Sequence, residues 1–222
     1  MVALDGLAVS VPETPCSESN TLFGAFRAVR AIQVRLERPP LVMCELRDTP
    51  RLFCPDHHAI ALPEGHKFPV GKYGILRELL EHEGRFRLEP APLADVETLE
   101  LAHDPAYVQG FLQGDLPPST MRRIGLPWSE ALVKRAFASV GGTISAAADA
   151  LETGWGGTLG GGTHHAFRAE GAGFCVFNDI AVAIESLRQR GRIRRAAVID
   201  LDVHQGDGTA EVFRNDADVF TL

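Results

Sequence analysis

The hydrophobic and polar positions of this chain form short apolar runs that alternate with longer amphipathic segments. The clearest apolar run covers residues 196–199. A run of this length, rich in β-branched residues and followed by glycines, is typical of a buried strand in a parallel sheet. The same criteria predict further strands at residues 51–54, 86–88, 155–159 and 218–222.

Helical periodicity lies between these strands. The longest predicted helix covers residues 129–152, with Ser129 as its N-cap. Its Gly141-Gly142 pair weakens it unless a neighbouring element packs closely there. Shorter helices are predicted at residues 70–83, 105–111, 179–190 and 209–213, whereas residues 110–128 are expected to be a loop. The order strand–helix–strand–helix–strand predicts an α/β protein with a parallel sheet, whose sites form at the carboxyl ends of the strands.

The first 50 residues are less regular and are punctuated by prolines. We expect residues 1–50 to be a poorly ordered extension. An amphipathic interaction helix over residues 21–36 is the alternative. Residues 51–222 are predicted to form the organised domain.

Composition restricts the class of protein. The formal charge of −7 and the pI near 5.6 argue against a general nucleic-acid-binding surface and against an anionic membrane as partner. The chain shows neither a signal peptide nor a run long enough to span a membrane, so a cytoplasmic location is expected. No Cys-x-x-Cys motif is present, and isolated reduced thiols are expected for Cys16, Cys44, Cys54 and Cys175 rather than two disulfides.

A cluster of polar residues follows the strand predicted at 196–199. Asp200, Asp202 and His204 occupy every second position, so their side chains are expected to point to one side. Carboxylates that leave a buried strand are costly unless a positive charge holds them, and a divalent metal such as zinc satisfies this requirement. A polar loop end without metal is the alternative.

Asp202 and His204 are the candidate metal ligands, but a catalytic zinc usually has three protein ligands. His164 and His165 follow another predicted strand. They are candidates either for a further ligand or for acid–base groups, with Asp200 and Asp207 orienting them.

Other motifs are less informative. The glycines of residues 154–162 have neither the spacing of a dinucleotide fingerprint nor a following Gly-Lys-Ser/Thr, and no Gly-x-Ser-x-Gly elbow is present. The Asp56-His57-His58 sequence suggests a metal site, although a solvated or hydrogen-bonded loop is the more common outcome for such a pair. The arginines of residues 188–195 are typical of a solvated helix end.

Several motifs together resemble the zinc-dependent histone deacetylase family. They are Pro63-Glu64-Gly65-His66-Lys67-Phe68-Pro69, His103-Asp104-Pro105-Ala106-Tyr107, Gly161-Gly162-Thr163-His164-His165-Ala166, Gly173-Phe174-Cys175, Asn178-Asp179, and the stretch from Ile199 to Gly208. Gln205 stands where many members have a second histidine, which is more similar to the class IV and related bacterial branch.

The resemblance implies a three-layer α/β/α sandwich with a central parallel sheet, as in arginase and the deacetylases. It implies zinc as cofactor, with Asp202 and His204 as two of its three ligands. It also implies that His165 is the general base and acid, that His164 is its electrostatic partner, and that Asp207 and Asp200 are the paired carboxylates. Asp200 further matches part of a structural potassium site. Gly173 and Phe174 match the wall of the acyl-lysine channel.

The family pattern continues past the equivalent of Leu222. The third zinc ligand, an aspartate, and a carbonyl-polarising tyrosine lie in that later part, so residues 51–222 match the N-terminal portion of a catalytic domain and a C-terminally truncated chain is expected. The implied function is hydrolysis of N-acetyl-lysine amides in a protein or peptide. The alternatives are an acetylpolyamine or other small-amide amidohydrolase, and a non-catalytic remnant or binding module. The sequence does not give the oligomeric state.

Overall fold

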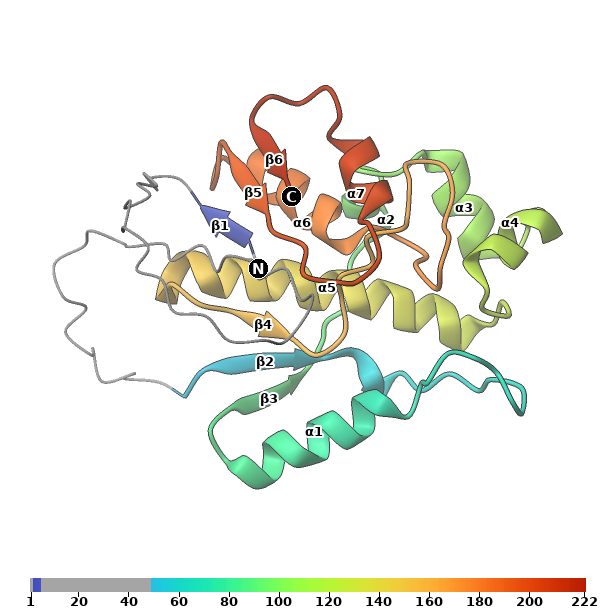
Figure 1. The fold of residues 1–222 in the computed structure, drawn as a ribbon, viewed down its shortest axis with the longest axis horizontal. Coiled ribbons are helices and arrows are strands. Elements are labelled where there is room, and N and C mark those ends of the chain that lie inside the picture. The colour runs from blue at the N-terminus through green and yellow to red at the C-terminus, as the bar shows by residue number, and fades with distance from the viewer. Residues whose placement is uncertain (1, 5–48) are drawn as a thin grey trace, which may run out of the picture. The chain divides into compact units, whose positions relative to one another are not determined.

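The computed structural model describes residues 2–4 and 49–222 (Figure 1). The strands are β1 (Val2–Leu4), β2 (Arg51–Cys54), β3 (Arg87–Pro90), β4 (Gly157–Thr158), β5 (Ala196–Val198) and β6 (Val219–Thr221). The helices are α1 (Lys72–Glu83), α2 (Val96–Leu99), α3 (Pro105–Gln113), α4 (Pro118–Ile124), α5 (Glu130–Thr153), α6 (Asp179–Gln189) and α7 (Asp207–Val212), with a short 3₁₀ turn at Pro55–His57.

The strands form two three-stranded sheets. In the first, β2 lies between β3 and β4 and is parallel to both. In the second, β5 lies between β1 and β6, parallel to β6 and antiparallel to β1. The predicted parallel α/β arrangement is therefore present. Among the described residues, however, it is divided between two sheets rather than joined in one, because β4 pairs only with β2 and both sides of β5 are taken by β1 and β6.

Helix α5 is the central element of this arrangement. It packs against β2, β4 and α6 and lies between the sheet of β2–β4 and the region of β5, β6 and α6 (Figure 1). The Oγ atom of Ser129 accepts a hydrogen bond from the amide of Leu132, so the predicted N-cap is present. A Cβ atom on Gly141 would lie 2.0 Å from the carbonyl oxygen of Pro92. Gly141 therefore allows a neighbouring segment to pack closely against the helix, which was the condition under which the glycine pair was expected.

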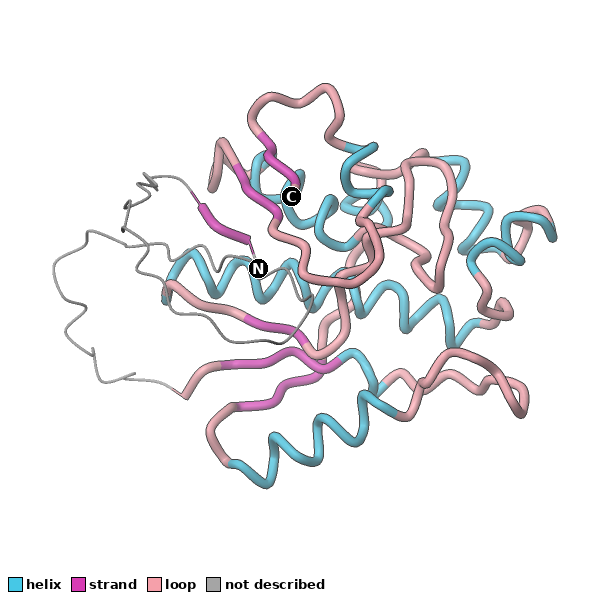
Figure 2. Tube along the Cα trace, viewed as in Figure 1, coloured by secondary structure: helices cyan, strands magenta, loops and turns pink. Residues whose placement is uncertain are grey.

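The core beneath the loops is centred on Phe177, which is 2% exposed. The rings of Tyr107, Phe111 and Phe137 meet its ring edge-on, with centroids 5.3–5.9 Å away. Such edge-to-face contacts stabilise beyond simple area burial. Because Phe177 lies two residues before Asp179, where α6 begins, this packing also fixes the end of the long loop that joins β4 to α6 (Figure 2).

One expectation about the helices was wrong. The predicted loop at residues 110–128 contains α4, which begins at Pro118 and ends at Ile124. The next residue, Gly125, has a left-handed backbone conformation and caps the helix. With only seven residues, α4 is too short to give a clear periodicity. The helix predicted at residues 70–83 is present as α1, and its Leu76 and Leu79 are 41% and 62% exposed because α1 lies at the outside of the β3 edge (Figure 1).

The structure also bears on the predicted strands, cysteines and membrane spans. The predicted strand at 155–159 is confined to β4, whereas the strands at 51–54 and around 196–199 are confirmed. The interaction helix considered for residues 21–36 lies outside the described residues. Within the described part of the chain, Cys54 and Cys175 are free and buried, and no helix has the length and apolar character needed to cross a membrane.

Candidate active site

The candidate site residues come from two segments far apart in the sequence. His164 and His165 lie in the loop after β4, and Asp200, Asp202 and His204 lie in the segment after β5. Asp207 is the first residue of α7. The structure brings these six residues together at the carboxyl ends of β4 and β5, the position expected for a site in a parallel sheet.

The first pair joins His164 to Asp200. The Nδ1 atom of His164 lies 2.5 Å from Oδ2 of Asp200, and the His164 residue is 6% exposed. Burial alone would raise the pKa of Asp200, but its hydrogen bonds with His164 and with the amide of Asp202 outweigh burial and lower it. A Cβ atom on Gly206 would lie 2.4 Å from Oδ2 of Asp200, so a larger residue at this position would displace the carboxylate that holds His164.

The second pair joins His165 to Asp207, with Nδ1 of the imidazole 2.7 Å from Oδ1 of the carboxylate. Burial opposes ionisation of Asp207, but the hydrogen bond with His165 and its charge bring the pKa below the ordinary value. The side chain of His165 is 22% exposed. The rings of His164 and His165 have centroids 4.2 Å apart. Two adjacent imidazoles, one buried and one open to solvent, are thus each oriented by a carboxylate.

Asp202 and His204 lie at the solvent-exposed side of this cluster. The Oδ1 atom of Asp202 accepts from the amide of His204 at 2.7 Å and lies 2.9 Å from its Nδ1. These hydrogen bonds lower the pKa of Asp202. The ring of His204 approaches that of His165, with centroids 6.0 Å apart.

The donor atoms of Asp202 and His204 fit a zinc ion in part. Two ligands of one tetrahedral zinc lie roughly 3.3 Å apart, by the usual bond lengths to oxygen and nitrogen, which is close to the observed 2.9 Å. A carboxylate oxygen and an imidazole nitrogen are also a normal zinc donor set. Within residues 2–4 and 49–222, however, no group of three His, Cys, Asp or Glu side chains is arranged to hold a metal. His164 and His165 are not part of such a group, and Nδ1 of each is hydrogen-bonded to its own carboxylate.

Asn178 connects the two segments of the site, a role that the sequence alone did not reveal. Its side-chain amide donates to the carbonyl of Ala166 at 3.1 Å and to the hydroxyl of Thr209 at 3.0 Å. The amide of Thr209 in turn donates to the carbonyl of His164 at 3.0 Å. The available signal was an asparagine immediately before a predicted helix, since such a residue is a favoured N-cap. It does cap α6, by accepting from the amide of Ala181.

Gly173 and Phe174 lie beside His165 in a tight turn. Gly173 has φ +55 and Phe174 has φ +67, a conformation that is uncommon for a bulky residue. Their amides donate to the carbonyls of Arg123 and Ile124 at 3.1 and 2.7 Å, so the end of α4 holds this turn in place. A Cβ atom on Gly173 would lie 2.7 Å from Cδ2 of His165. The turn therefore forms a close wall next to the imidazole.

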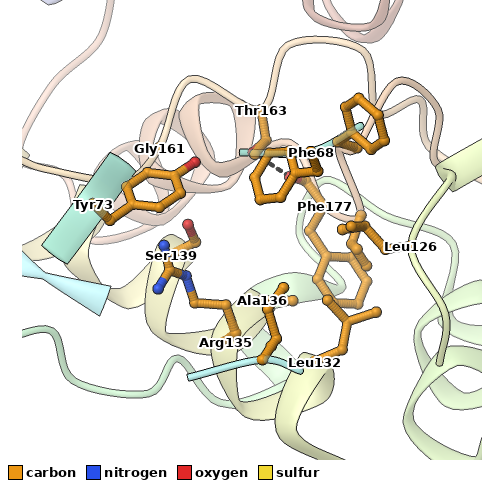
Figure 3. A pocket seen from close by; sticks show the side chains of 13 residues that line it. Phe68, Tyr73, Leu126, Leu132, Arg135, Ala136, Ser139, Gly161, Thr163 and Phe177 are labelled. Carbon is orange, nitrogen blue, oxygen red and sulfur yellow. Dashed lines mark hydrogen bonds between the residues drawn. The ribbon is translucent and has the colours of Figure 1, made fainter. Parts of the chain in front are cut away.

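A cavity of about 60 Å³ lies beneath the loop that precedes the histidines (Figure 3). Its wall combines Gly161 and Thr163 with the polar ends of Arg135, Tyr73 and Ser139. The Arg135 residue is 8% exposed, its guanidinium lies over the Tyr73 ring at 4.4 Å, and burial lowers its pKa. The volume is sufficient for a water molecule or another very small ligand.

The Asp56-His57-His58 sequence is hydrogen-bonded within the protein. Asp56 forms an ion pair with Arg77 at 2.9 Å, and Nδ1 of His57 contacts the carbonyl of Cys54 at 2.8 Å. These contacts agree with the hydrogen-bonded interpretation of this motif. No metal-binding group of three side chains includes it among the described residues.

Comparisons with known proteins identify the family of this chain. The histone deacetylase domain family matches residues 66–222. The chain belongs to this family. The predicted resemblance is thus confirmed, and the fold is that of the arginase and deacetylase proteins.

Among its bacterial relatives, an uncharacterised protein of Picosynechococcus is 47% identical over 176 residues, which cover 78% of this chain and 58% of that protein. The acetoin utilization protein AcuC of Bacillus subtilis is 32% identical over 193 residues, covering 80% of this chain and 49% of AcuC. The crystal structure of a histone deacetylase homologue from Aquifex aeolicus superposes with a TM-score of 0.66 at 28% identity, over 78% of this chain and 50% of that one. The chain thus spans about half the length of the relatives that it matches.

Proposed function

We propose that this protein hydrolyses N-acetylated amines, with the N-acetyl-lysine side chain of a protein or peptide as substrate. The main observation behind this proposal is the pair of adjacent histidines, His164 and His165, each hydrogen-bonded through Nδ1 to its own carboxylate. A carboxylate on Nδ1 fixes the tautomer of an imidazole and leaves Nε2 to exchange a proton with substrate or water. Amide hydrolysis requires such an exchange twice, once at water and once at the leaving amine.

His165 is the proposed general base and acid. Its imidazole is partly exposed, whereas that of His164 is buried, so His165 is the one that substrate and water reach. In this scheme Nε2 of His165 accepts the proton of the attacking water and later delivers it to the amine, while Asp207 stabilises the cationic ring. The neighbouring His164–Asp200 pair stabilises negative charge that develops beside it.

Asp202 and His204 are the proposed zinc ligands, and Asp200 additionally matches part of a structural potassium site. A zinc ion polarises a carbonyl group and lowers the pKa of water when it is bound at such a site. The turn of Gly173 and Phe174 is the proposed wall of the channel that receives the acyl chain. Its closeness to His165 supports this assignment.

The decisive experiment measures zinc content and turnover of the purified 222-residue chain together. We expect zinc by elemental analysis, release of acetate from an acetyl-lysine peptide, and loss of that turnover in His165→Ala with the zinc content unchanged. Retained turnover in His165→Ala would contradict its role as the base. A panel of acetylated polyamines, assayed beside the peptide, separates the proposed substrate from small acetylated amines.

A non-catalytic role is the second candidate, and one observation favours it. The side chains of Asp202 and His204 are 51% and 72% exposed, and the described residues supply no third ligand. A folded chain that contains no zinc and shows no turnover would support this candidate and contradict the first for this chain.

A further inference from the structure

Asp179 is a fully buried carboxylate that none of the chemistry above uses. It is the first residue of α6 and is 0% exposed. A buried carboxylate is costly unless hydrogen-bond donors surround it. At Asp179 the donors come from two places, the loop that leads to the catalytic histidines and helix α5.

The loop donates to both carboxylate oxygens through its backbone. Oδ1 of Asp179 accepts from the amide of Thr163 at 2.7 Å and lies 2.5 Å from its hydroxyl, which is equally close to the carbonyl oxygen of Phe177. Oδ2 accepts from the amide of Gly162 at 3.0 Å. A Cβ atom on Gly161 would lie 2.5 Å from Oδ2, so the backbone wraps closely around the carboxylate and requires glycine there.

Helix α5 supplies the remaining donor. The hydroxyl of Thr143 donates to Oδ2 of Asp179 at 2.5 Å. One turn earlier in α5, the hydroxyl of Ser139 donates to the carbonyl of Gly160 at 3.1 Å. Both helices that pack at the centre of the protein therefore hold the same loop, which also forms one wall of the cavity (Figure 3).

His164 and His165 follow Thr163 directly, so the position of their backbone depends on how the loop is held. Asp207 and Asp200 orient the rings of these histidines from one side, and Gly173 restricts His165 from another. None of these contacts fixes the backbone before the histidines. The carboxylate of Asp179 does so, through the amides of Gly162 and Thr163.

We propose that Asp179 is the positioning residue for His164 and His165. It touches neither substrate nor reacting atoms, and it acts by fixing the backbone of Gly162 and Thr163. This inference rests on the proposed function only for its effect on turnover. Its effect on the geometry of the histidines stands independently.

The test compares Asp179→Asn with the unmodified 222-residue chain. An asparagine keeps the shape but replaces one carboxylate oxygen with an NH₂ group, so the amide of either Gly162 or Thr163 must lose its acceptor. In ¹⁵N-labelled protein we expect the amide signals of Gly162 and Thr163 and the imidazole signals of His164 and His165 to move. Turnover per folded molecule is expected to fall roughly 10- to 100-fold with KM changed less than about twofold, because small displacements of a catalytic group reduce rate rather than binding.

Asp149→Asn is the matched control. Asp149 is a partly buried carboxylate on α5 that pairs with Arg51 and does not contact the loop. We expect this variant to be less stable but to leave the histidine signals and turnover unchanged. If Asp179→Asn behaves in the same way, Asp179 stabilises the fold without positioning the histidines, and the proposal is overturned.

A second pair of variants covers the case in which Asp179→Asn does not fold. Thr143→Val removes only the donor from α5, and Thr143→Ser retains it. We expect Thr143→Val to move the histidine signals and Thr143→Ser to leave them in place, and equal spectra would overturn the proposal. If the unmodified chain shows no turnover, the proposed function fails, while the spectra still decide whether Asp179 positions the two histidines.

Discussion

The Nε2 atom of His103 accepts a hydrogen bond from the backbone amide of Asn178 at 2.9 Å. The His103 residue is buried and only 2% exposed. The Nδ1 atom lies 3.3 Å from the carbonyl oxygen of Arg168. A neutral ring with its proton on Nδ1 satisfies both contacts. A second proton, on Nε2, would face the N–H of Asn178 and break the bond that joins the start of α3 to the start of α6.

This contact predicts a loss of stability in mild acid. Burial lowers the pKa of His103 to about 4 from its ordinary 6.5, and the charge of Arg168 acts in the same direction. Between these two values the unfolded chain binds more protons than the native one, so the free energy of unfolding falls as the pH falls. The expected contribution of this residue is roughly 3 kcal/mol over the window. Urea unfolding between pH 7 and pH 4.5 measures it.

Two variants test whether His103 is responsible. His103→Gln removes the titrating group and is expected to flatten the pH dependence, at some cost in stability at pH 7. His82→Gln changes an exposed histidine of α1 and is expected to leave the pH dependence as it was. An unaltered slope in His103→Gln would show that other groups cause the acid sensitivity.

Gly141 and Gly74 are expected to respond to alanine in opposite directions. A Cβ atom on Gly141 would lie 2.0 Å from the carbonyl oxygen of Pro92, so Gly141→Ala should destabilise the protein by about 2–3 kcal/mol through overpacking. Gly74 lies in α1, and apart from its chain neighbours and the backbone of its own helix no atom lies within 4 Å of the added Cβ. Gly74→Ala should therefore add about 0.5–1 kcal/mol through helix propensity. Denaturant midpoints of the two variants show whether each substitution lowers or raises the free energy of unfolding. A Gly141→Ala variant as stable as the unmodified protein would contradict the close packing of α5.

The hydroxyl of Ser186 predicts a stabilising substitution. Ser186 is 1% exposed within α6, and its Oγ atom has no hydrogen-bond partner in the described structure. Ser186→Ala removes an unsatisfied buried group and should raise the free energy of unfolding by about 1 kcal/mol. Ser139→Ala is the contrasting variant, because the Oγ atom of Ser139 donates to Gly160. It should lower stability by a similar amount, and thermal unfolding compares the two.

The His165–Asp207 hydrogen bond predicts a tautomer effect on turnover. Asp207→Asn keeps the shape of the side chain but offers an NH₂ group to Nδ1, which favours the tautomer with its proton on Nε2. Under the proposed mechanism, turnover should fall roughly 10²- to 10⁴-fold. Glu152→Gln, which alters an exposed ion pair with Arg192, should leave turnover unchanged. Equal rates for the two variants would remove Asp207 from the mechanism.

Much of the fold follows from local signals. Ser129 before a long amphipathic run and Asp104-Pro105 before a shorter one both marked helix starts, since capping depends on residues next to each other in the chain. Helix α4 was missed because seven residues between glycines carry little periodicity. The exposure of Leu76 and Leu79 in α1 could not be predicted, because periodicity identifies an apolar face but does not show what covers it.

The sequence by itself determined the composition of the candidate site and its family. Asp200, Asp202 and His204 alternate after an apolar strand, and this local pattern suffices to place them at one sheet edge. Only the tertiary structure decided how they are held. Thr143, Thr163 and Asp179 come from three elements of the fold, and their hydrogen bonds around one buried carboxylate arise from the packing of α5 against α6. Contacts between residues so distant in the chain depend on the path of the backbone, which local sequence patterns do not encode.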